Sequence, residues 1–176
     1  PVWRIGRGEI ANASGAPSMG GERAVASWEE DSLTMAVEAG LDCLAGTDPK
    51  EIDGLYFATI SSPFEEKQAA SIIASALDLK KDAYTSDITG SLRAGTSALK
   101  AAFDAVKAGS ARKALVIAAD CRSATPRSEF EQIYGDGAVA LLIGEDGVIA
   151  DIEGFSTFSD SIPGPWRRGE DTYPKT

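Results

Sequence analysis

Hydrophobic residues first take a helical spacing in the segment 28–44. One face of the predicted helix carries four leucine or valine side chains spaced four, four and three residues apart: Leu33, Val37, Leu41 and Leu44. Ser27 followed by Glu30 has the spacing of a capping box at the helix start. Residues 1–26 are rich in Gly, Ala and Ser and show no sustained period. We therefore expect 1–26 to be largely loop, with a short helical turn around 8–13.

Short apolar runs then alternate with helical patterns. Runs of strand length, bounded by Gly, Pro or polar turns, favour buried strands over helices. These predicted strands cover 53–60, 83–88, 114–119 and 137–144. Helical spacing predicts helices over 67–79 and 92–108. A fifth strand, 147–155, is predicted to pair with the fourth through a turn at 145–147.

This order of elements predicts an α/β layered domain with a five-stranded mixed sheet flanked by helices. Residues 114–119 are apolar at every position, which is typical of a strand covered by helices on both faces. We expect this strand to neighbour the one that ends near Thr89, because the helix between them is long enough for a right-handed crossover.

The composition fits one globular domain, with 43% hydrophobic and 25% charged residues in a chain of 176. The chain starts at Pro1 without a methionine and has no closing element near Thr176, so we expect it to be a piece of a longer protein. A net charge of -10 disfavours binding to nucleic acid or anionic lipid, and a polyanionic ligand would need a local basic patch. With no apolar run of membrane-spanning length and no signal-like start, we expect a cytoplasmic protein.

Two cysteines, Cys43 and Cys121, are too few for a disulfide framework. Neither lies in a pattern that binds zinc, so no metal site is predicted, and a reducing compartment fits best. Cys121 follows a strand end and either reaches a cleft or is an incidental thiol, whereas Cys43 is expected to serve packing. The sequence has no histidine, so any imidazole must come from elsewhere.

Three segments together resemble the thiolase superfamily, in particular hydroxymethylglutaryl-CoA synthases and, more distantly, ketoacyl synthase III. Segment 87–99, DITGSLRAGTSAL, is similar to the family's turn from strand to helix at the nucleophile. Segment 113–120, KALVIAAD, is similar to the central strand that follows. Segment 134–143, YGDGAVALLI, is similar to the family's Gly-Asp-Gly-Ala strand entry. Further support comes from 22–38 and from WRRG at 166–169.

The resemblance implies a fold of two similar halves, each with a five-stranded sheet, and an active site between them. This chain covers the amino-terminal half as a single domain over 1–176, and residues 160–176 would begin a loop toward the second half. In the family, the second half supplies a histidine and groups that bind the thioester oxygen. The first half supplies a cysteine nucleophile and often a glutamate.

The chain departs from the family at both catalytic positions. The cysteine position falls on Leu92, which cannot form a thioester, although a helix start would favour a thiolate there. The glutamate position, aligned through residues 61–63, falls on Ile60. A shift of the alignment by one residue would place Ser91 at the nucleophile position, at the cost of the matches within 95–99.

Several other residues have both a functional and a structural interpretation. Thr89 and Ser91 can offer hydroxyl groups to a bound thioester or cap the following helix. Asp136, between two glycines, either fixes a turn or contacts substrate.

The arginines are candidates for binding coenzyme A. Arg93 can meet a phosphate or carboxylate, or be a solvated residue of the first helical turn. Arg167 and Arg168 form the densest basic pair and belong either to a loop on the substrate side or to an ordinary surface.

The resemblance implies a protein that makes or breaks a C–C bond on an acyl-CoA thioester, a transferase chemistry of the Claisen type, without the cysteine nucleophile. The substrate would be a coenzyme A thioester, with no cofactor bound by this chain. The alternative is a non-catalytic scaffold or pseudoenzyme subunit that pairs with a catalytic homologue or with an OB-fold zinc-ribbon protein. An ordinary hydroxymethylglutaryl-CoA synthase is disfavoured by Leu92. In either case we expect a homo-oligomer or association with the second half.

Overall fold

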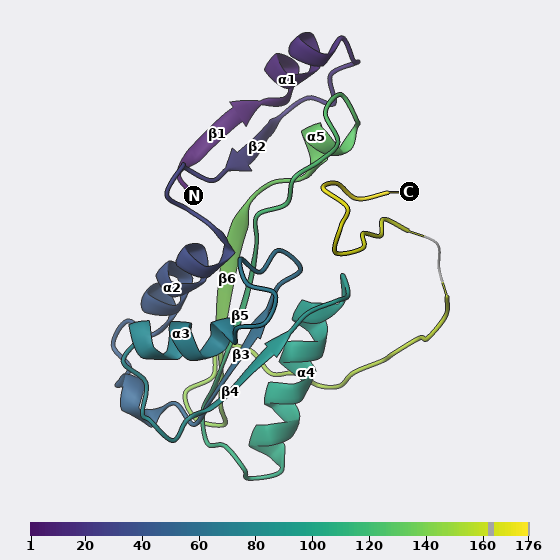
Figure 1. Ribbon diagram of the computed structural model, residues 1–176. Helices are drawn as coiled ribbons and strands as arrows, with labels where there is room; N and C mark the ends of the chain where they lie inside the picture. Colours follow the sequence, from purple (N-terminus) through teal and green to yellow (C-terminus); the bar gives the residue numbers. More distant parts are fainter. Residues whose placement is uncertain (162–163, 176) are drawn as a thin grey trace.

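A computed structural model describes residues 1–161 and 164–175 (Figure 1). Its main sheet has the strand order β4-β3-β5-β6, in which β3 pairs in parallel with both β4 and β5, and β6 runs antiparallel to β5. The strands are β3 (Gly54–Ala58), β4 (Tyr84–Ile88), β5 (Ala114–Asp120) and β6 (Gly137–Ile143). The predicted α/β fold with a mixed sheet is thus confirmed.

Helices cover both faces of this sheet (Figure 1). They are α2 (Ser32–Cys43), α3 (Ala69–Ala76) and α4 (Ala94–Lys107). Successive side chains of a strand point to opposite faces, so Leu55 and Phe57 of β3 pack with α2 and α3. Tyr56 and Ala58 pack with α4 on the other face. The side chains of β3 thus alternate between two separate hydrophobic cores, one on each face of the sheet, which explains why residues 55–58 of the strand are all hydrophobic.

Helix α2 approaches the sheet closely at Gly40. A Cβ atom at this position would lie 2.7 Å from a methyl group of Leu77 and 3.1 Å from one of Ile117. Glycine therefore lets the helix backbone rest directly on its neighbours in the core. The contact fixes α2 against both β5 and the end of α3.

Two predictions about the sheet are wrong. Residues 147–155 form no strand, so the main sheet has four strands among the described residues rather than five. The strands β4 and β5 lie in one sheet but are not neighbours, because β3 lies between them. All five residues of β3 are buried, which suits a strand paired on both edges. The crossover through α4 therefore passes over β3.

The prediction that 1–26 is largely loop is also wrong. This segment forms β1 (Trp3–Gly6), α1 (Arg7–Ser14) and β2 (Glu22–Val25), with β1 and β2 antiparallel. Together with α5 (Phe130–Ile133), these elements form an arm at one end of the sheet (Figure 1). The strands have four residues each, too few to show a period in the sequence, and they are specified by pairing with each other.

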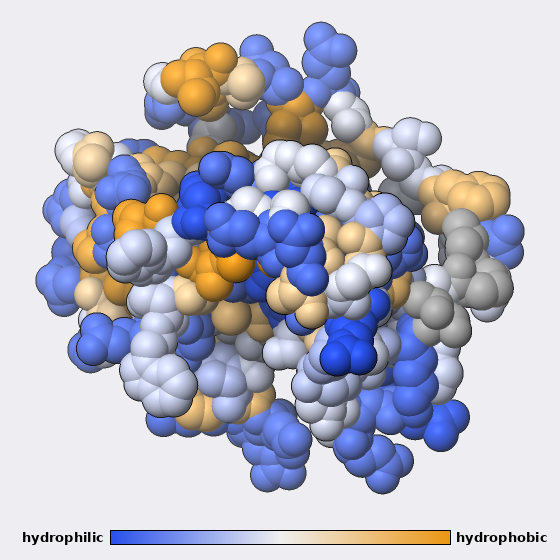
Figure 2. Space-filling view, turned by 90° about the horizontal axis from the view of Figure 1, so that it is seen from above, coloured by the Kyte–Doolittle hydropathy of each residue, from blue (hydrophilic) through white to orange (hydrophobic). Residues whose placement is uncertain are grey.

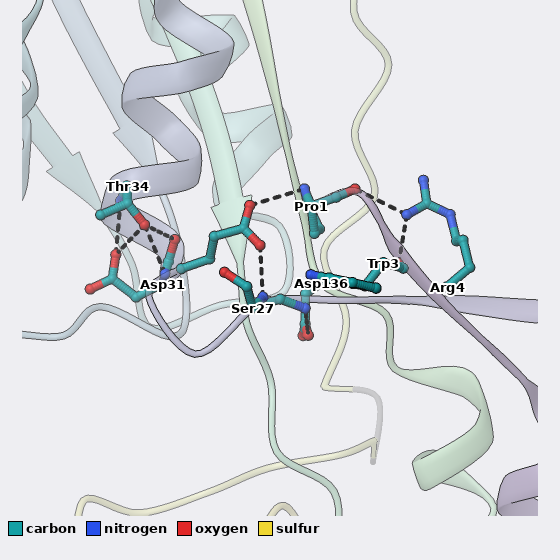
Figure 3. Close-up of polar contacts among 9 residues, drawn as sticks. Pro1, Trp3, Arg4, Ser27, Asp31, Thr34 and Asp136 are labelled. Carbon is teal, nitrogen blue, oxygen red and sulfur yellow. Dashed lines mark hydrogen bonds and ion pairs between the residues drawn. The ribbon is translucent and has the colours of Figure 1, made fainter.

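Asp136 joins this arm to the main sheet (Figure 3). Its carboxylate accepts a hydrogen bond from the Ala26 amide at 2.8 Å, and its own amide donates to the Ala24 carbonyl at 3.1 Å. The side chain is buried, with 8% exposed. Asp136 thus fixes a long-range junction rather than the local turn that one interpretation of the sequence gave it.

The start of α2 also differs from the prediction. Glu30 accepts a hydrogen bond from the Ser27 amide at 2.7 Å, yet no helix begins there. The capping box is formed by Asp31 and Thr34, and α2 begins at Ser32 (Figure 3). Asp31 and Thr34 have the same three-residue spacing as Ser27 and Glu30, so the spacing alone did not identify the cap.

Asp53 ties together the starts of three strands. Its carboxylate pairs with Lys80 and accepts hydrogen bonds from the amides of Arg112 at 2.6 Å and Lys113 at 3.3 Å. Its backbone carbonyl accepts from the Tyr84 amide at 2.8 Å. The hydrogen bond from Lys80, followed by those from the two amides, outweighs desolvation and lowers the pKa of Asp53 to about 2.

We predict that Asp53→Asn weakens the fold and removes part of its acid sensitivity. A carboxylate with a lowered folded-state pKa stabilises the protein above its ordinary pKa of 3.8, and this stability is lost as the pH falls from about 4 toward 2. Hydrogen bonds to a charged group contribute roughly 1.5–3 kcal/mol. Urea unfolding at pH 7 and pH 3 should show a variant deficit that shrinks in acid, with Asp82→Asn as the exposed control. An equal deficit at both pH values would contradict this role.

Candidate functional site

A cavity of about 580 Å³ lies at the carboxyl ends of β3, β4 and β5. Three strand-end segments line it, 60–62, 89–92 and 121–123, and residues of the 165–174 segment complete the wall. In open α/β sheets, ligands bind at this edge, where the strand ends leave a crevice. The surface seen from the arm end has separate hydrophobic patches among hydrophilic residues, without one continuous apolar face (Figure 2).

The cavity brings together most of the residues singled out from the sequence. Ile60, Thr89, Ser91, Leu92 and Arg167 all line it. Residues more than 100 positions apart in the chain thus meet at one edge of the sheet. The predicted coenzyme A contacts Arg93 and Arg168 do not line the cavity.

Leu92 lies in the turn that leads from β4 into α4. The helix begins at Ala94 with Arg93 as its N-cap residue. Leu92 therefore precedes the first helical turn, whereas the sequence predicted that it lies on that turn. A buried leucine is also expected at this position, but Leu92 is 60% exposed. Gly90, with φ of 77°, provides the left-handed backbone conformation that the turn requires.

Ser91 holds this turn through two hydrogen bonds. Its Oγ accepts from the Arg93 amide at 3.2 Å, and its carbonyl accepts from the Ala94 amide at 2.9 Å. A hydroxyl group that accepts a backbone hydrogen bond keeps its own proton free to donate. Ser91 therefore shapes the turn before α4 but does not cap the helix, whose N-cap residue, Arg93, has no side-chain cap hydrogen bond. A hydroxyl donor at the cavity wall remains.

Asp120, which sequence reasoning did not single out, organises the opposite wall. Its Oδ1 accepts hydrogen bonds from the Thr59 hydroxyl at 3.0 Å, the Ile60 amide at 2.8 Å and the Ser61 hydroxyl at 2.8 Å. Ser61 Oγ also accepts from the Cys121 amide at 2.9 Å. These bonds fix the backbone that carries Ile60. A carboxylate directly after a buried strand was the available signal.

Both cysteines have weakly acidic thiols. Cys121 lines the cavity, and burial, followed by the nearby Asp136 carboxylate, raises its pKa to about 11. Burial also raises the pKa of Cys43. Very little thiolate is therefore present at neutral pH, and neither cysteine is suited to nucleophilic attack.

The remaining wall is a small loop closed on itself. Trp166 and Lys175 exchange backbone hydrogen bonds of 2.9 and 2.8 Å. The cations of Arg168 and Lys175 lie 5.5 and 5.2 Å from the centre of the Trp166 ring. Asp171 forms an ion pair with Lys175 at 2.6 Å. These contacts order the segment that carries Arg167 into the cavity lining.

Within residues 1–161 and 164–175, no group of three or more His, Cys, Asp or Glu side chains is arranged to hold a metal ion. No helix in the same residues is long and apolar enough to cross a membrane.

Comparisons with known proteins agree with this fold. Residues 86–161 match the family of 3-oxoacyl-[acyl-carrier-protein] synthase III. The hydroxymethylglutaryl-CoA synthase of Pyrococcus furiosus is 34% identical over 180 residues, which cover 99% of this chain and 51% of the relative. The hydroxymethylglutaryl-CoA synthase of Pyrobaculum arsenaticum is 35% identical over 155 residues, which cover 87% of this chain and 44% of the relative. The chain spans about half the length of the curated relatives it matches.

Two solved structures are similar in fold. A structure of MvaS in complex with 3-hydroxy-3-methylglutaryl coenzyme A has a TM-score of 0.76 at 26% identity, covering 81% of this chain and 37% of that one. A structure of hydroxymethylglutaryl-CoA synthase complexed with CoA has a TM-score of 0.86 at 23% identity, and the match covers 98% of this chain and 47% of that one. At this identity the similarity shows the fold alone. The fold is therefore that of a thiolase-like α/β domain. By sequence, the chain is a homologue of the hydroxymethylglutaryl-CoA synthases.

We predict that a cysteine placed at Leu92 reacts far faster than the native thiols. In a Cys43→Ser, Cys121→Ser background, Leu92→Cys puts a thiol next to the start of α4, where the helix dipole favours the thiolate. Iodoacetamide labelling at neutral pH should be on the order of 100-fold faster than labelling of native Cys121, because a pKa near 11 leaves so little thiolate.

The matched control is Leu41→Cys in the same background. Leu41 is similarly exposed, 53% against 60%, but lies in the last turn of α2, where the dipole disfavours a thiolate. We expect it to react about 2- to 5-fold more slowly than the thiol at position 92. Equal rates at the two positions would rule out a helix-start effect.

Proposed function

We propose that this chain forms part of a thiolase-like protein that binds an acyl-CoA thioester and makes or breaks a C–C bond without a covalent acyl-enzyme. The observation that carries the proposal is the cavity at the strand ends, which is lined by Leu92 and Ile60. The sequence resemblance assigns these two residues to the positions of the family's catalytic cysteine and glutamate. The likeness to proteins solved with 3-hydroxy-3-methylglutaryl coenzyme A or with CoA supports a coenzyme A thioester as the substrate.

The cavity wall is suited to stabilising a negative oxygen. Ser91 keeps a hydroxyl proton to donate, and Thr89 presents a second hydroxyl group beside it. Donors directed at a thioester oxygen stabilise the enolate that forms when the α-proton is removed, and such stabilisation is often the largest contribution to catalysis. This chemistry needs no nucleophile on the protein.

None of the residues that could act as the nucleophile in this cavity favours covalent catalysis. Leu92 has no electron pair to give, and the pKa of Cys121 is about 11. The serines of the cavity have no histidine in this chain to deprotonate them. No carboxylate lines the cavity within the described residues, so the base that removes the α-proton would be supplied from outside this wall.

We expect incubation with isotope-labelled acetyl-CoA to leave no acyl group on this chain. Intact-mass spectrometry after a short pulse and an acid quench is the measurement, since a thioester adduct survives those conditions. The positive control is Leu92→Cys in the Cys43→Ser, Cys121→Ser background, which restores a sulfur at the helix start. A stable adduct on Ser91, Cys121 or any other residue of the wild-type chain would overturn the non-covalent proposal.

A second candidate is a non-catalytic subunit that pairs with another protein. Its support is an uncovered apolar strip on β6, where Val139 is 54% and Leu141 is 45% exposed. They are paired in register with Ala118 and Val116, whose side chains belong to the core under α4. The strip is thus the part of that sheet face that α4 does not reach. A second copy, a further domain or an OB-fold zinc-ribbon subunit would cover it.

We predict that Leu141→Lys weakens such association without unfolding the domain. Burying apolar area contributes about 25 cal/mol per Å², so replacing a half-exposed leucine by a cation in an interface should weaken association about 10-fold or more. Light scattering over a concentration series reports the mass, and Leu41→Lys on α2 is the matched control. Unchanged mass for Leu141→Lys in a protein that self-associates would exclude the strip as the interface.

A further inference from the structure

The cavity has a charge opposite to that of the chain. The sequence holds 27 acidic and 17 basic residues, yet no aspartate or glutamate lines the cavity. Two arginines do line it, Arg122 and Arg167. In a chain with a net charge of -10, a cavity whose charged lining residues, within the described chain, are both arginines is a local positive site that would attract an anion.

Arg122 is held in place by aromatic stacking. Its guanidinium carbon lies 4.1 Å from the centre of the Tyr134 ring. Tyr134 in turn stacks on Phe130, with ring centres 4.9 Å apart and planes inclined by 21°. The stack holds the guanidinium over the Tyr134 ring, so less conformational freedom is lost when it binds a ligand.

Neither arginine is neutralised in the described part of the chain. The ion pairs found there involve neither Arg122 nor Arg167. Asp120, next to this wall, uses its Oδ1 to hold Thr59, Ile60 and Ser61. Asp171 pairs with Lys175 and accepts from the Arg168 amide at 2.9 Å. The donors of both guanidinium groups are thus available to a ligand.

We propose that Arg122 and Arg167 form an anion subsite of the cavity that binds an oxyanion of the substrate. The inference rests on the proposed function, because it names the part of the thioester that the cavity recognises. Guanidinium presents paired N–H groups that match the oxygens of a carboxylate or phosphate. The oxyanion belongs either to a carboxylate on the acyl chain or to a phosphate of coenzyme A, and these two sources are separable by choice of ligand.

The test is isothermal calorimetry with four ligands on the folded protein. Acetyl-S-pantetheine has no charge, glutaryl-S-pantetheine adds a carboxylate, acetyl-CoA adds the phosphates, and inorganic pyrophosphate lacks the thioester. Arg122→Gln and Arg167→Gln should each weaken binding of the recognised anion roughly 10- to 100-fold and leave acetyl-S-pantetheine unchanged. A carboxylate site would affect glutaryl-S-pantetheine, whereas a phosphate site would affect acetyl-CoA and pyrophosphate.

Two further variants sharpen the comparison. Arg122→Lys keeps the charge but loses the planar stack on Tyr134, so we expect it to recover only part of the affinity. Arg112→Gln makes the same change of charge at the other end of β5, on a side chain that is 85% exposed, and should bind like the wild type. Thermal unfolding of each variant checks that the fold is retained.

The outcomes separate the subsite from the proposed function. If acetyl-CoA and glutaryl-S-pantetheine bind all arginine variants as tightly as the wild type, the subsite is overturned and thioester binding stands. If no thioester binds the wild type while pyrophosphate binds in an Arg122-dependent manner, the proposed function fails and the anion site stands. If the wild type binds none of the four ligands, both are overturned.

Discussion

The parallel pairing of β3 with β4 on one side and β5 on the other is the constraint on which the cavity depends. Ala58 lies opposite both Ile88 and Ala118, so β3 and β4 end at the same level and β5 runs two residues further, to Asp120. Their following loops must then leave the sheet side by side, and a crevice forms between them. The burial of all five β3 residues makes this pairing the centre of both cores.

Two carboxylates secure the ends of this arrangement. Asp53 binds amides of Arg112 and Lys113 where the strands begin, and Asp120 holds the loop after β3 where they end. Both carboxylates are partly buried. A carboxylate that accepts several hydrogen bonds resists displacement, because leaving those donors unpaired costs free energy. The positions of Ile60 and Ser61 in the cavity are therefore set by Asp120 rather than by their own contacts with a ligand.

The residue next to the helix start in this site has no ionisable side chain. The turn from β4 into α4 presents Leu92 there, and leucine has no group to ionise. The nearest thiol, Cys121, is kept protonated by burial and by Asp136. Two arginines and several hydroxyl groups line the same cavity. The proposed function assigns to them the binding and polarisation of a substrate without a covalent bond to it.

The sequence by itself determined the buried strands, the helices over them and the resemblance that placed Leu92 and Ile60 at the family's catalytic positions, because apolar periodicity and local motifs are short-range properties. The tertiary structure alone decided that β3 separates β4 from β5, that 1–26 forms an ordered arm, and that 147–155 is not a strand. It also brought Arg122 and Arg167 to one cavity and Asp136 beside Ala26. These contacts join residues tens to more than a hundred positions apart, and their partners are chosen by packing and hydrogen bonding that no local pattern records.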